Sequence, residues 1–468
     1  MKWSSLMALA VTAGTAGAQP GAQPPPNPAP PMPAAPTPAA PGGPDPAGPT
    51  TSAAPEVLTL ERAIEIAMRQ QPSLRQTRAQ AEVARARVEL SRVGTRPIVA
   101  LDATAGVSSG RNATVLVPGG TVTGGGGSFF SHSESTGLGA SASWRLFDFG
   151  QTAANIRAAE LSAEAADAAV GTTTLDIRTN VETSYLEAVA RRRLVQVAEA
   201  TVKSEDAHLD QARRFVAAQA KDPIEVAQAQ SRDANARSAL AQAQSNEAIA
   251  LANLRSAIGW VDPANAPIVS ASWPTPAQAD PPPLAALVDT ARKSRPEIVQ
   301  LDRELAAADA SLEAARAERR PVLSANAQTQ WSPATGNWSP EPSWSAGLSL
   351  SWNLFDGGRS AADSRIAQAN LQGAAAARDA LLVSLTSQLD SARAQIVANR
   401  ANVAASTEAV SAARAQLQLA EARYTQGLGS QIELADAQTA VTTAQGNLVQ
   451  AEFQLATAWA QLHRATAR

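Results

Sequence analysis

The chain has 468 residues, of which 17% are charged and only 4% aromatic, with a formal net charge of −3. Charges of both signs are interspersed and form no basic stripe, so no nucleic-acid partner is expected. The sequence contains no cysteine, which excludes disulfides, cysteine metal sites and attachment to a membrane through a lipidated N-terminal cysteine. The abundance of Ala, Gln, Arg and Leu favours long helices over a large globular core.

The N-terminal residues have the pattern of a secretory signal peptide. Lys2 precedes an apolar stretch over 6–11, and small residues lead up to Ala18, so we expect a signal peptide over 1–18 that is cleaved after Ala18. Residues 19–55 hold 15 of the 31 prolines and predict a disordered tether. The sequence has no run of 18 apolar residues, so it offers no transmembrane helix.

The rest of the chain is a tandem duplication. Residues 144–150 read Trp-Arg-Leu-Phe-Asp-Phe-Gly, and residues 352–358, which lie 208 positions later, read Trp-Asn-Leu-Phe-Asp-Gly-Gly. Residues 224–230 match 432–438 at the same offset. Such internal repetition defines an architecture of two similar units.

Upstream of this motif the offset is 224, because Gln71-Pro72 matches Arg295-Pro296 and Pro97 matches Pro321. The difference of 16 residues is expected in a glycine-rich loop over 119–127. The predicted repeats are therefore 56–261 and 284–468, joined by a proline-rich linker over 262–283.

Each repeat is expected to begin with two short helices and to continue into a β-hairpin. The helices are predicted over 61–70 and 74–93, and over 284–293 and 298–319. A proline stops each second helix, and strands are predicted over 98–108, 137–147, 322–331 and 344–355.

All four strands alternate apolar with small polar residues, and their length is typical of an outer-membrane barrel strand. Trp144, Trp331, Trp344 and Trp352 lie in these strands and suit a membrane interface. The alternative for four strands is a soluble antiparallel sheet with one face in water.

Long helices are predicted over 151–217 and 359–425, because each span has one glycine and no proline. At about 1.5 Å per residue each would reach on the order of 100 Å. Apolar and small residues at steps of three and four from Leu382 to Tyr424 predict a coiled-coil seam. A tube wall suits this composition, although a coiled-coil rod is the alternative for the helices alone. A turn and a further helix follow each long helix, over 223–258 and 431–463.

With strand hairpins at one end, long helices at the other and everything doubled, the chain resembles the TolC-like outer-membrane efflux proteins over residues 57–465. The doubled Trp-x-Leu-Phe-Asp-x-Gly motif and the sequence from Tyr424 to Gln438 carry the resemblance. It implies a homotrimer in which twelve strands form a β-barrel in the outer membrane and twelve helices form a periplasmic tunnel. It also implies docking to a periplasmic adaptor and an inner-membrane pump. The strand count agrees, because four strands cannot close a barrel whereas three copies supply twelve.

Two groups of residues at the turns between the long helices are candidate sites. Gly427, Leu428, Gly429 and Ser430 form the second turn, which we expect to dock the adaptor. Gly427 and Ser430 equally fit plain helix caps. An exposed leucine at the apex of a turn is not needed for capping, so Leu428 distinguishes better between docking and capping. The first turn is one residue longer and lacks the glycine, so the two turns need not meet an adaptor in the same way.

Glu433 and Asp436, with Glu225 at the equivalent position of the first repeat, are the candidate entrance gate. Glu433 and Asp436 are spaced i,i+3, and threefold symmetry would gather six carboxylates at the tunnel entrance. By resemblance they match an acidic entrance ring. The alternative is that both simply stabilise a helix N-terminus.

Catalysis, cofactors and metals are not expected. The three histidines, His132, His208 and His463, have no ligand spacing, and no nucleophile motif occurs. The main rival is a periplasmic adaptor, which would show one helical hairpin between compact β domains and a membrane anchor at its N-terminus. The sequence shows neither feature.

Overall fold

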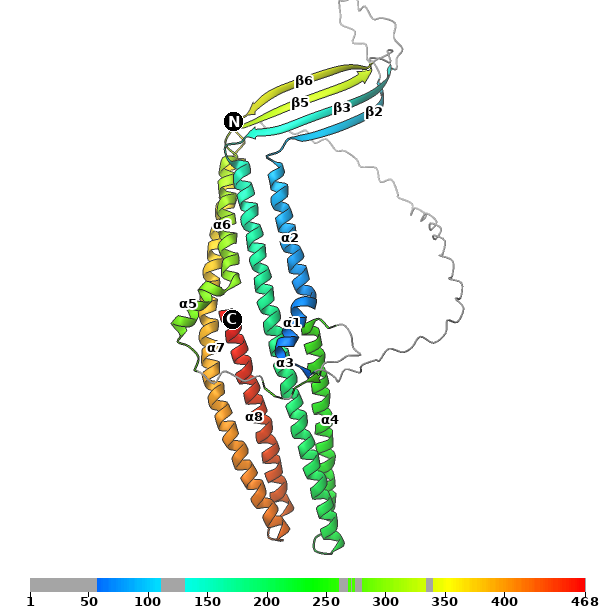
Figure 1. Cartoon of the computed structure of the whole chain (residues 1–468), viewed down its shortest axis with the longest axis vertical. Helices are drawn as coiled ribbons and strands as arrows, with labels where there is room; N and C mark the ends of the chain where they lie inside the picture. Colours follow the sequence, from blue (N-terminus) through cyan, green and yellow to red (C-terminus); the bar gives the residue numbers. More distant parts are fainter. Residues whose placement is uncertain are drawn as a thin grey trace, which may run out of the picture. The chain divides into compact units, whose positions relative to one another are not determined.

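The computed structural model describes residues 57–110, 131–260, 268–270, 272–273, 280–333 and 340–467. These belong to one structural unit, Pro55–Arg468. A four-stranded sheet lies at one end of this unit, and the two turns that follow the long helices lie at the other (Figure 1). The predicted signal peptide, tether and glycine-rich loop, and most of the predicted linker, fall outside the described residues.

The two repeats have matching elements. The first comprises α1 (Leu60–Gln70), α2 (Pro72–Val93), β2 (Ile98–Gly110), β3 (Ser131–Phe147), α3 (Gln151–Ala217) and α4 (Ile224–Ile258). The second comprises α5 (Leu284–Ser294), α6 (Pro296–Ala317), β5 (Val322–Pro333), β6 (Pro340–Ser351), α7 (Arg359–Thr425) and α8 (Gln431–Thr466). Both long helices, α3 and α7, contain 67 residues. The predicted mainly α fold with doubled β-hairpins and long helices is confirmed.

Prolines and glycines set the element boundaries. Pro72 and Pro296 are the first residues of α2 and α6, where a missing N–H is tolerated. Gly150 and Gly358 precede α3 and α7 with φ of 96° and 92°, a conformation that other residues adopt at a cost.

The shared Asp of the duplicated motif caps each long helix. Asp148 accepts hydrogen bonds from the backbone N–H of Gly150 and Thr152 at 3.2 and 2.8 Å. Asp356 accepts them from Gly358 and Ser360, both at 2.9 Å. A hydrogen bond from the Ser360 hydroxyl, followed by these two backbone bonds, lowers the pKa of Asp356 to about 2, so the carboxylate is ionised at neutral pH.

The sheet has the order β2-β3-β5-β6, and all its pairs are antiparallel. Since residues directly opposite each other share a face, the register places the apolar residues of all four strands on one side. This face contains Val99 and Leu101 of β2, Leu138 and Trp144 of β3, Ala325 and Trp331 of β5, and Trp344 and Leu348 of β6. Small polar residues such as Ser141, Asn326 and Ser345 occupy the other side. The predicted alternation is thus present in the sheet.

Five strand boundaries differ from the prediction. β2 and β5 each end two residues late, at Gly110 and Pro333, and β6 starts four residues early, at Pro340. Strand β3 starts at Ser131, six residues before the expected start. Strand β6 ends at Ser351 instead of reaching residue 355. β6 ends there because Ser351 pairs with Val322, the first residue of β5. Among the described residues β6 has no second neighbouring strand with which it could pair beyond that point.

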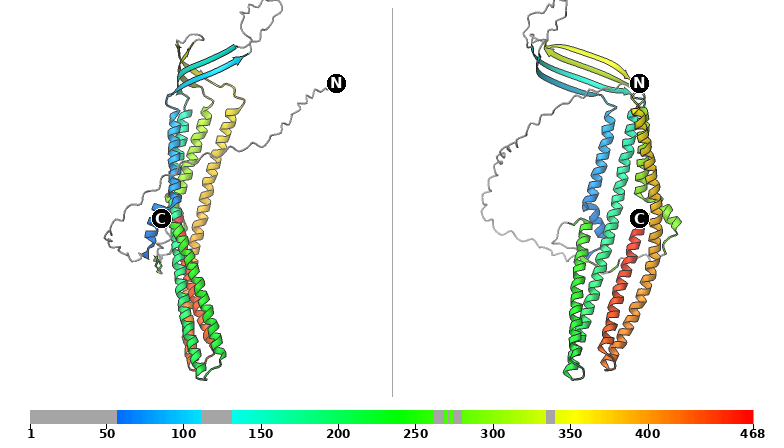
Figure 2. Two further views of the ribbon diagram at one scale, coloured as in Figure 1. Left: turned by 90° about the vertical axis from the view of Figure 1, so that its right-hand side faces the viewer. Right: turned by 180° about the vertical axis from the view of Figure 1, so that it is seen from behind.

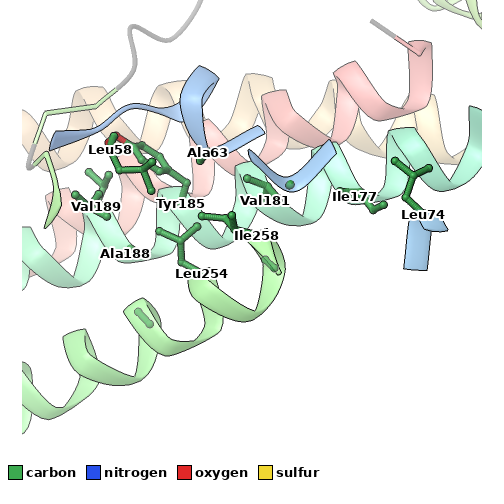
Figure 3. Packing of buried hydrophobic residues seen from close by; sticks show 14 residues of the cluster. Leu58, Ala63, Leu74, Ile177, Val181, Tyr185, Ala188, Val189, Leu254 and Ile258 are labelled. Carbon is green, nitrogen blue, oxygen red and sulfur yellow. The ribbon is translucent and has the colours of Figure 1, made fainter. Parts of the chain in front are cut away.

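The shorter helices pack along two different halves of the long helices. α2 and α6 flank the sheet-proximal half of the long helices, whereas α4 and α8 flank the distal half (Figure 2). The first core joins α1, α3, α4 and the short strands β1 (Val57–Leu58) and β4 (Ile268–Val269) (Figure 3). Within it the Tyr185 hydroxyl donates to the Leu58 carbonyl at 3.1 Å. A second core contains Leu385, Leu389 and Ile396 of the predicted seam.

The repeats are also joined halfway along the helices. Glu452 of α8 forms an ion pair with Arg193 of α3, and it accepts a hydrogen bond from the indole N–H of Trp273 at 2.7 Å. None of the helices in the described ranges is both long and apolar enough to cross a membrane.

Candidate functional site

The turn between α7 and α8 is held by backbone bonds. Gly427 has a φ of 73°, and the N–H groups of Leu428 and Gly429 both donate to the Arg423 carbonyl, at 2.9 and 3.0 Å. A Cβ on Gly429 would lie 3.0 Å from the Tyr424 nitrogen, so the turn has little room for a side chain there. The apex residue, Leu428, is 71% exposed.

Ser430 begins the next helix as its N-cap. Its hydroxyl accepts a hydrogen bond from the Glu433 N–H at 3.1 Å, which satisfies a donor that the first turn of a helix leaves free. Gly427 and Ser430 therefore have a structural role that is sufficient to explain them. Leu428 has no such role, so it remains the residue of this turn that best fits a docking contact.

The turn between α3 and α4 reaches a similar conformation without glycine. Gln219, the equivalent of Gly427, has a φ of 53°, in the region where a side chain is strained. The Ala220 N–H donates to the Phe215 carbonyl at 2.9 Å. The expectation that this turn is one residue longer is wrong, because the bond from Ala220 to Phe215 corresponds to the bond from Leu428 to Arg423 at the same offset of 208 that relates Ile224 to Ile432. Within the turn, the Asp222 carboxylate accepts from the Ile224 N–H at 3.1 Å.

The two turns are joined to each other through Glu225. The Tyr424 hydroxyl donates to the Glu225 carboxylate at 3.0 Å, and the Gln431 side chain donates to the Glu225 carbonyl at 3.0 Å. Lys221 lies 3.4 Å from the same carboxylate and 5.2 Å from the centroid of the Tyr424 ring. Phe215 contacts the ring edge to face at 5.8 Å between centroids. We call this group, Phe215, Lys221, Glu225, Tyr424 and Gln431, the tip contact.

Burial and the neighbouring Glu225 carboxylate keep the Tyr424 hydroxyl of the tip contact neutral. Tyr424 is 2% exposed, and burial followed by the bond to Glu225 raises its pKa to about 12. The neutral hydroxyl is therefore the favoured form in the folded chain. Its stabilising contribution is fully present below the ordinary pKa of 10 and is lost as pH rises through about 12. The hydroxyl remains a donor at every physiological pH.

The three candidate gate residues have different environments. Glu225 is committed to the tip contact, and its side chain is 15% exposed. Glu433 forms an ion pair with Arg423 at 2.9 Å and lies in the first turn of α8. Asp436 is exposed. One chain does not bring the three carboxylates together, so a ring of charge requires further copies.

Tyr424, Gln431 and Lys221 are site residues that we did not predict from the sequence. The signal for Tyr424 was available, because it is one of only two tyrosines in the chain and it ends the coiled-coil seam. Its partner Glu225 lies 199 positions away, and no periodicity connects the two.

The four tryptophans lie at different positions along the strands. Trp144 pairs with Ala325, and Trp331 lies six residues further along that strand, opposite Leu138, which corresponds to roughly 20 Å. Trp344, near the level of Trp331, is 80% exposed. Trp352 follows Ser351, the last residue of β6, and lies four residues beyond Leu348, which the register aligns with Trp144 through Ala325.

Trp144 and Trp352 also have a second role. Their indole N–H groups donate to the carbonyls of Thr95 and Arg319, each at 3.0 Å. Both bonds fasten the end of one strand to the segment that enters its neighbour, at equivalent places in the two repeats. A place at a membrane interface is compatible with this role and remains a prediction.

Within the described ranges, no group of three or more His, Asp or Glu side chains could hold a metal ion. The sheet with one apolar face, the helices of about 100 Å and the joined turns at the far end define a class of membrane-associated duct protein.

Comparison with known proteins assigns the family. The family model of the outer membrane efflux protein matches residues 63–260 and 287–468, and the chain belongs to this family. It is an outer-membrane protein of a channel family, and the assignment decides against the alternative of a periplasmic adaptor.

One curated relative and several solved structures are similar. Protein CyaE of Bordetella pertussis is 33% identical over 307 residues, which are 64% of this chain and 61% of that protein. The match therefore spans less than two thirds of the relative. A membrane protein from Pseudomonas aeruginosa has a TM-score of 0.73 at 23% identity, covering 90% of this chain and 99% of that one. The CmeC outer membrane channel of Campylobacter jejuni has a TM-score of 0.74 at 16% identity, covering 87% and 85%.

Proposed function

We propose that the chain forms, as a homotrimer, the exit duct of a tripartite efflux or secretion system. Substrates would pass from an inner-membrane pump and a periplasmic adaptor through the helical tunnel and the outer-membrane barrel. The observation that carries the proposal is the sheet, whose apolar face exposes Val99 and Leu101 at 74% each and Trp344 at 80%. A face of this kind is stable against lipid and not against water.

The number of copies follows from the strand count. Four strands are too few to close a barrel, and unpaired strand edges are not tolerated in the hydrocarbon core. Eight strands leave an interior filled by side chains, whereas twelve leave space for a passage. Three copies therefore fit a duct.

The distal turns serve two purposes in this proposal. Exposed Leu428 docks the adaptor, and the carboxylates of Glu433 and Asp436 form a ring at the entrance. The tip contact holds the two helical hairpins of each copy together, so a wider entrance requires the Tyr424–Glu225 bond to break.

Two measurements test the proposal. Detergent-purified protein would be sized by light scattering and then inserted in planar lipid bilayers. We expect a trimer that conducts. A monomer without conductance would reject the proposed function.

A further inference from the structure

The apolar face of the sheet has a hollow over its middle strands. Two adjoining depressions, of about 470 and 340 Å³, share Ala142, Ala327 and Ala346 in their lining. The register places these three residues side by side on β3, β5 and β6. An alanine side chain ends at its Cβ, so the face is recessed where the three lie together.

Bulky side chains border the hollow. Trp144 and Leu348 line the depression nearest to the helices and lie on either side of Ala325. Trp344 lines the other depression, opposite Thr329. Ala325 and Thr329 are four residues apart on β5, which corresponds to roughly 13 Å, and the flanking strands β3 and β6 are roughly 10 Å apart. The hollow therefore follows β5 as an elongated depression, which we call the trough.

The end of the trough nearest to the helices has fixed walls. The Trp144 indole N–H donates to the Thr95 carbonyl at 3.0 Å, which holds the ring in place. Pro97 lines the same end, and its ring restricts its backbone. Thr95 and Pro97 both belong to the loop 94–97, which joins α2 to β2. The trough therefore opens toward this loop, at the level where the sheet meets the helices.

A positive charge lies beside this opening. Arg96 directly precedes Pro97 and is exposed. Carboxylates of the adjoining segments are already committed, since Glu160 forms an ion pair with Arg92 at 2.7 Å and Asp148 caps α3. These carboxylates do not neutralise Arg96, whose charge can therefore act on an anionic group outside the chain.

The equivalent loop of the second repeat is also basic. Arg319 and Arg320 are both exposed there, beside one carboxylate, Glu318. Arg320 donates to the Phe149 carbonyl at 2.8 Å, and this bond leaves its charge in place because the acceptor is neutral. Excess positive charge at a membrane surface attracts anionic lipids. The end of the sheet that adjoins the helices therefore suits the phosphate groups of a lipid leaflet.

A phospholipid has both of the groups that the trough and Arg96 would bind. Its acyl chain is long, narrow and apolar, and the trough is continuous with the exposed apolar face that contacts lipid in the proposed barrel. Its phosphate lies at one end of the chain, as Arg96 lies at one end of the trough. A free phosphate would use Arg96 alone, and a hydrocarbon without a charged group would use the trough alone.

We propose that the trough and Arg96 form a binding site for one anionic phospholipid of the periplasmic leaflet in each copy. An acyl chain lies between Trp144 and Leu348 and extends over Ala327, and the phosphate accepts hydrogen bonds from the Arg96 guanidinium. The inference rests on the homotrimeric barrel proposed above and adds to it a lipid that the barrel holds at a defined place.

Native mass spectrometry of the detergent-purified protein tests the site, because it counts the lipids that stay bound to each trimer. The trimer is titrated with phosphatidylglycerol and, separately, with phosphatidylcholine, whose headgroup carries no net charge. We expect up to three molecules of phosphatidylglycerol to be retained by the three copies and phosphatidylcholine to bind more weakly. Equal retention of the two lipids would overturn the proposed role of charge.

Arg96→Gln tests the phosphate contact. It should weaken the binding of phosphatidylglycerol about fivefold, the contribution of one basic residue near a membrane surface. Arg87→Gln, which removes an exposed arginine of α2, is the control and should leave the binding unchanged. Equal affinities of the two variants would show that Arg96 does not bind the lipid.

Ala327→Phe tests the trough by filling it. This variant should retain less phosphatidylglycerol than the unchanged protein. Ala103→Phe, which places the same ring opposite Leu138 on the same face and outside the trough, should retain as much. Ala346→Phe fills the trough from β6 and replaces Ala327→Phe if that variant does not assemble.

Two results would overturn the role of the trough. One is equal retention of phosphatidylglycerol by the filled variant and by Ala103→Phe. The other is displacement of the lipid by an equal concentration of glycerol 3-phosphate, because the headgroup alone would then account for the binding. Native size and bilayer conductance are measured for every variant. A conducting trimer of the unchanged protein that retains no phosphatidylglycerol would overturn the inference and leave the proposed function intact, whereas a monomer without conductance would reject both.

Discussion

Replacing Tyr424 by phenylalanine should loosen the entrance end of the duct. The substitution keeps the ring and its contact with Phe215, and it removes the hydroxyl that donates to the Glu225 carboxylate at 3.0 Å. Glu225 retains Lys221 at 3.4 Å, so no unpaired charge is left behind. The change therefore isolates one bond between the two hairpins.

The size of the effect follows from the kind of bond. A hydrogen bond to a charged group contributes about 1.5–3 kcal/mol, which corresponds to a factor of roughly 10 to 150 in an equilibrium constant. The ratio of separated to joined hairpins should rise by that factor in each copy. The closed channel would then open more often at a given voltage.

Single-channel recording in planar bilayers measures this ratio as open probability. Tyr185→Phe is a matched control, because the chain has only two tyrosines and the Tyr185 hydroxyl bonds to the Leu58 carbonyl far from the turns. We expect Tyr424→Phe to raise open probability and Tyr185→Phe to leave it unchanged. An unchanged value for Tyr424→Phe would refute the role of the tip contact in closing the entrance.

Four further predictions concern the turns and the strand–helix junction. Leu428→Asp should abolish efflux in cells with trimer yield unchanged, and normal efflux would reject the docking role. Glu433→Gln with Asp436→Asn should reduce cation selectivity and relieve block by a trivalent cation, most clearly at low ionic strength; if single-channel recordings show neither change, these carboxylates act only on the helix end. Gln219→Gly should raise the free energy of unfolding by about 0.5–1 kcal/mol in chemical denaturation, because glycine adopts the positive φ without strain. Asp356→Asn should lower the thermal midpoint much more at pH 7 than near pH 2, since a carboxylate with a pKa lowered to about 2 stabilises the fold fully above its ordinary pKa of 3.8 and loses this effect as pH falls through about 2; equal losses at both values, followed by circular dichroism, would contradict the capping role.

The main elements could be predicted because each depends on a local pattern. The absence of proline between residues 359 and 425 is enough to predict α7, and period-two alternation is enough to predict which face of β6 is apolar. The end of β6 could not be predicted from its own residues, because strand length depends on the strand that pairs with it, and among the described residues β6 pairs with β5 alone.

The candidate site was predictable only in part, for the same reason. Helix-cap patterns identified Gly427 and Ser430 at the correct turn, since capping is a property of a few consecutive residues. The contact of Tyr424 with Glu225 depends on how two hairpins from different repeats lie side by side, and nothing in either segment alone encodes it. The roles of Leu428, Glu433 and Asp436 stay predictions.

The equal length of α3 and α7, 67 residues each, restricts how such a chain can change during evolution. Both helices start at the same sheet and end at turns that must meet. An insertion of seven residues in one helix alone would carry its turn about 10 Å past the other and separate Tyr424 from Glu225. A lineage that needs a longer or shorter duct must therefore change both halves of the gene by the same number of residues. The length of the duct is thus encoded twice in one gene.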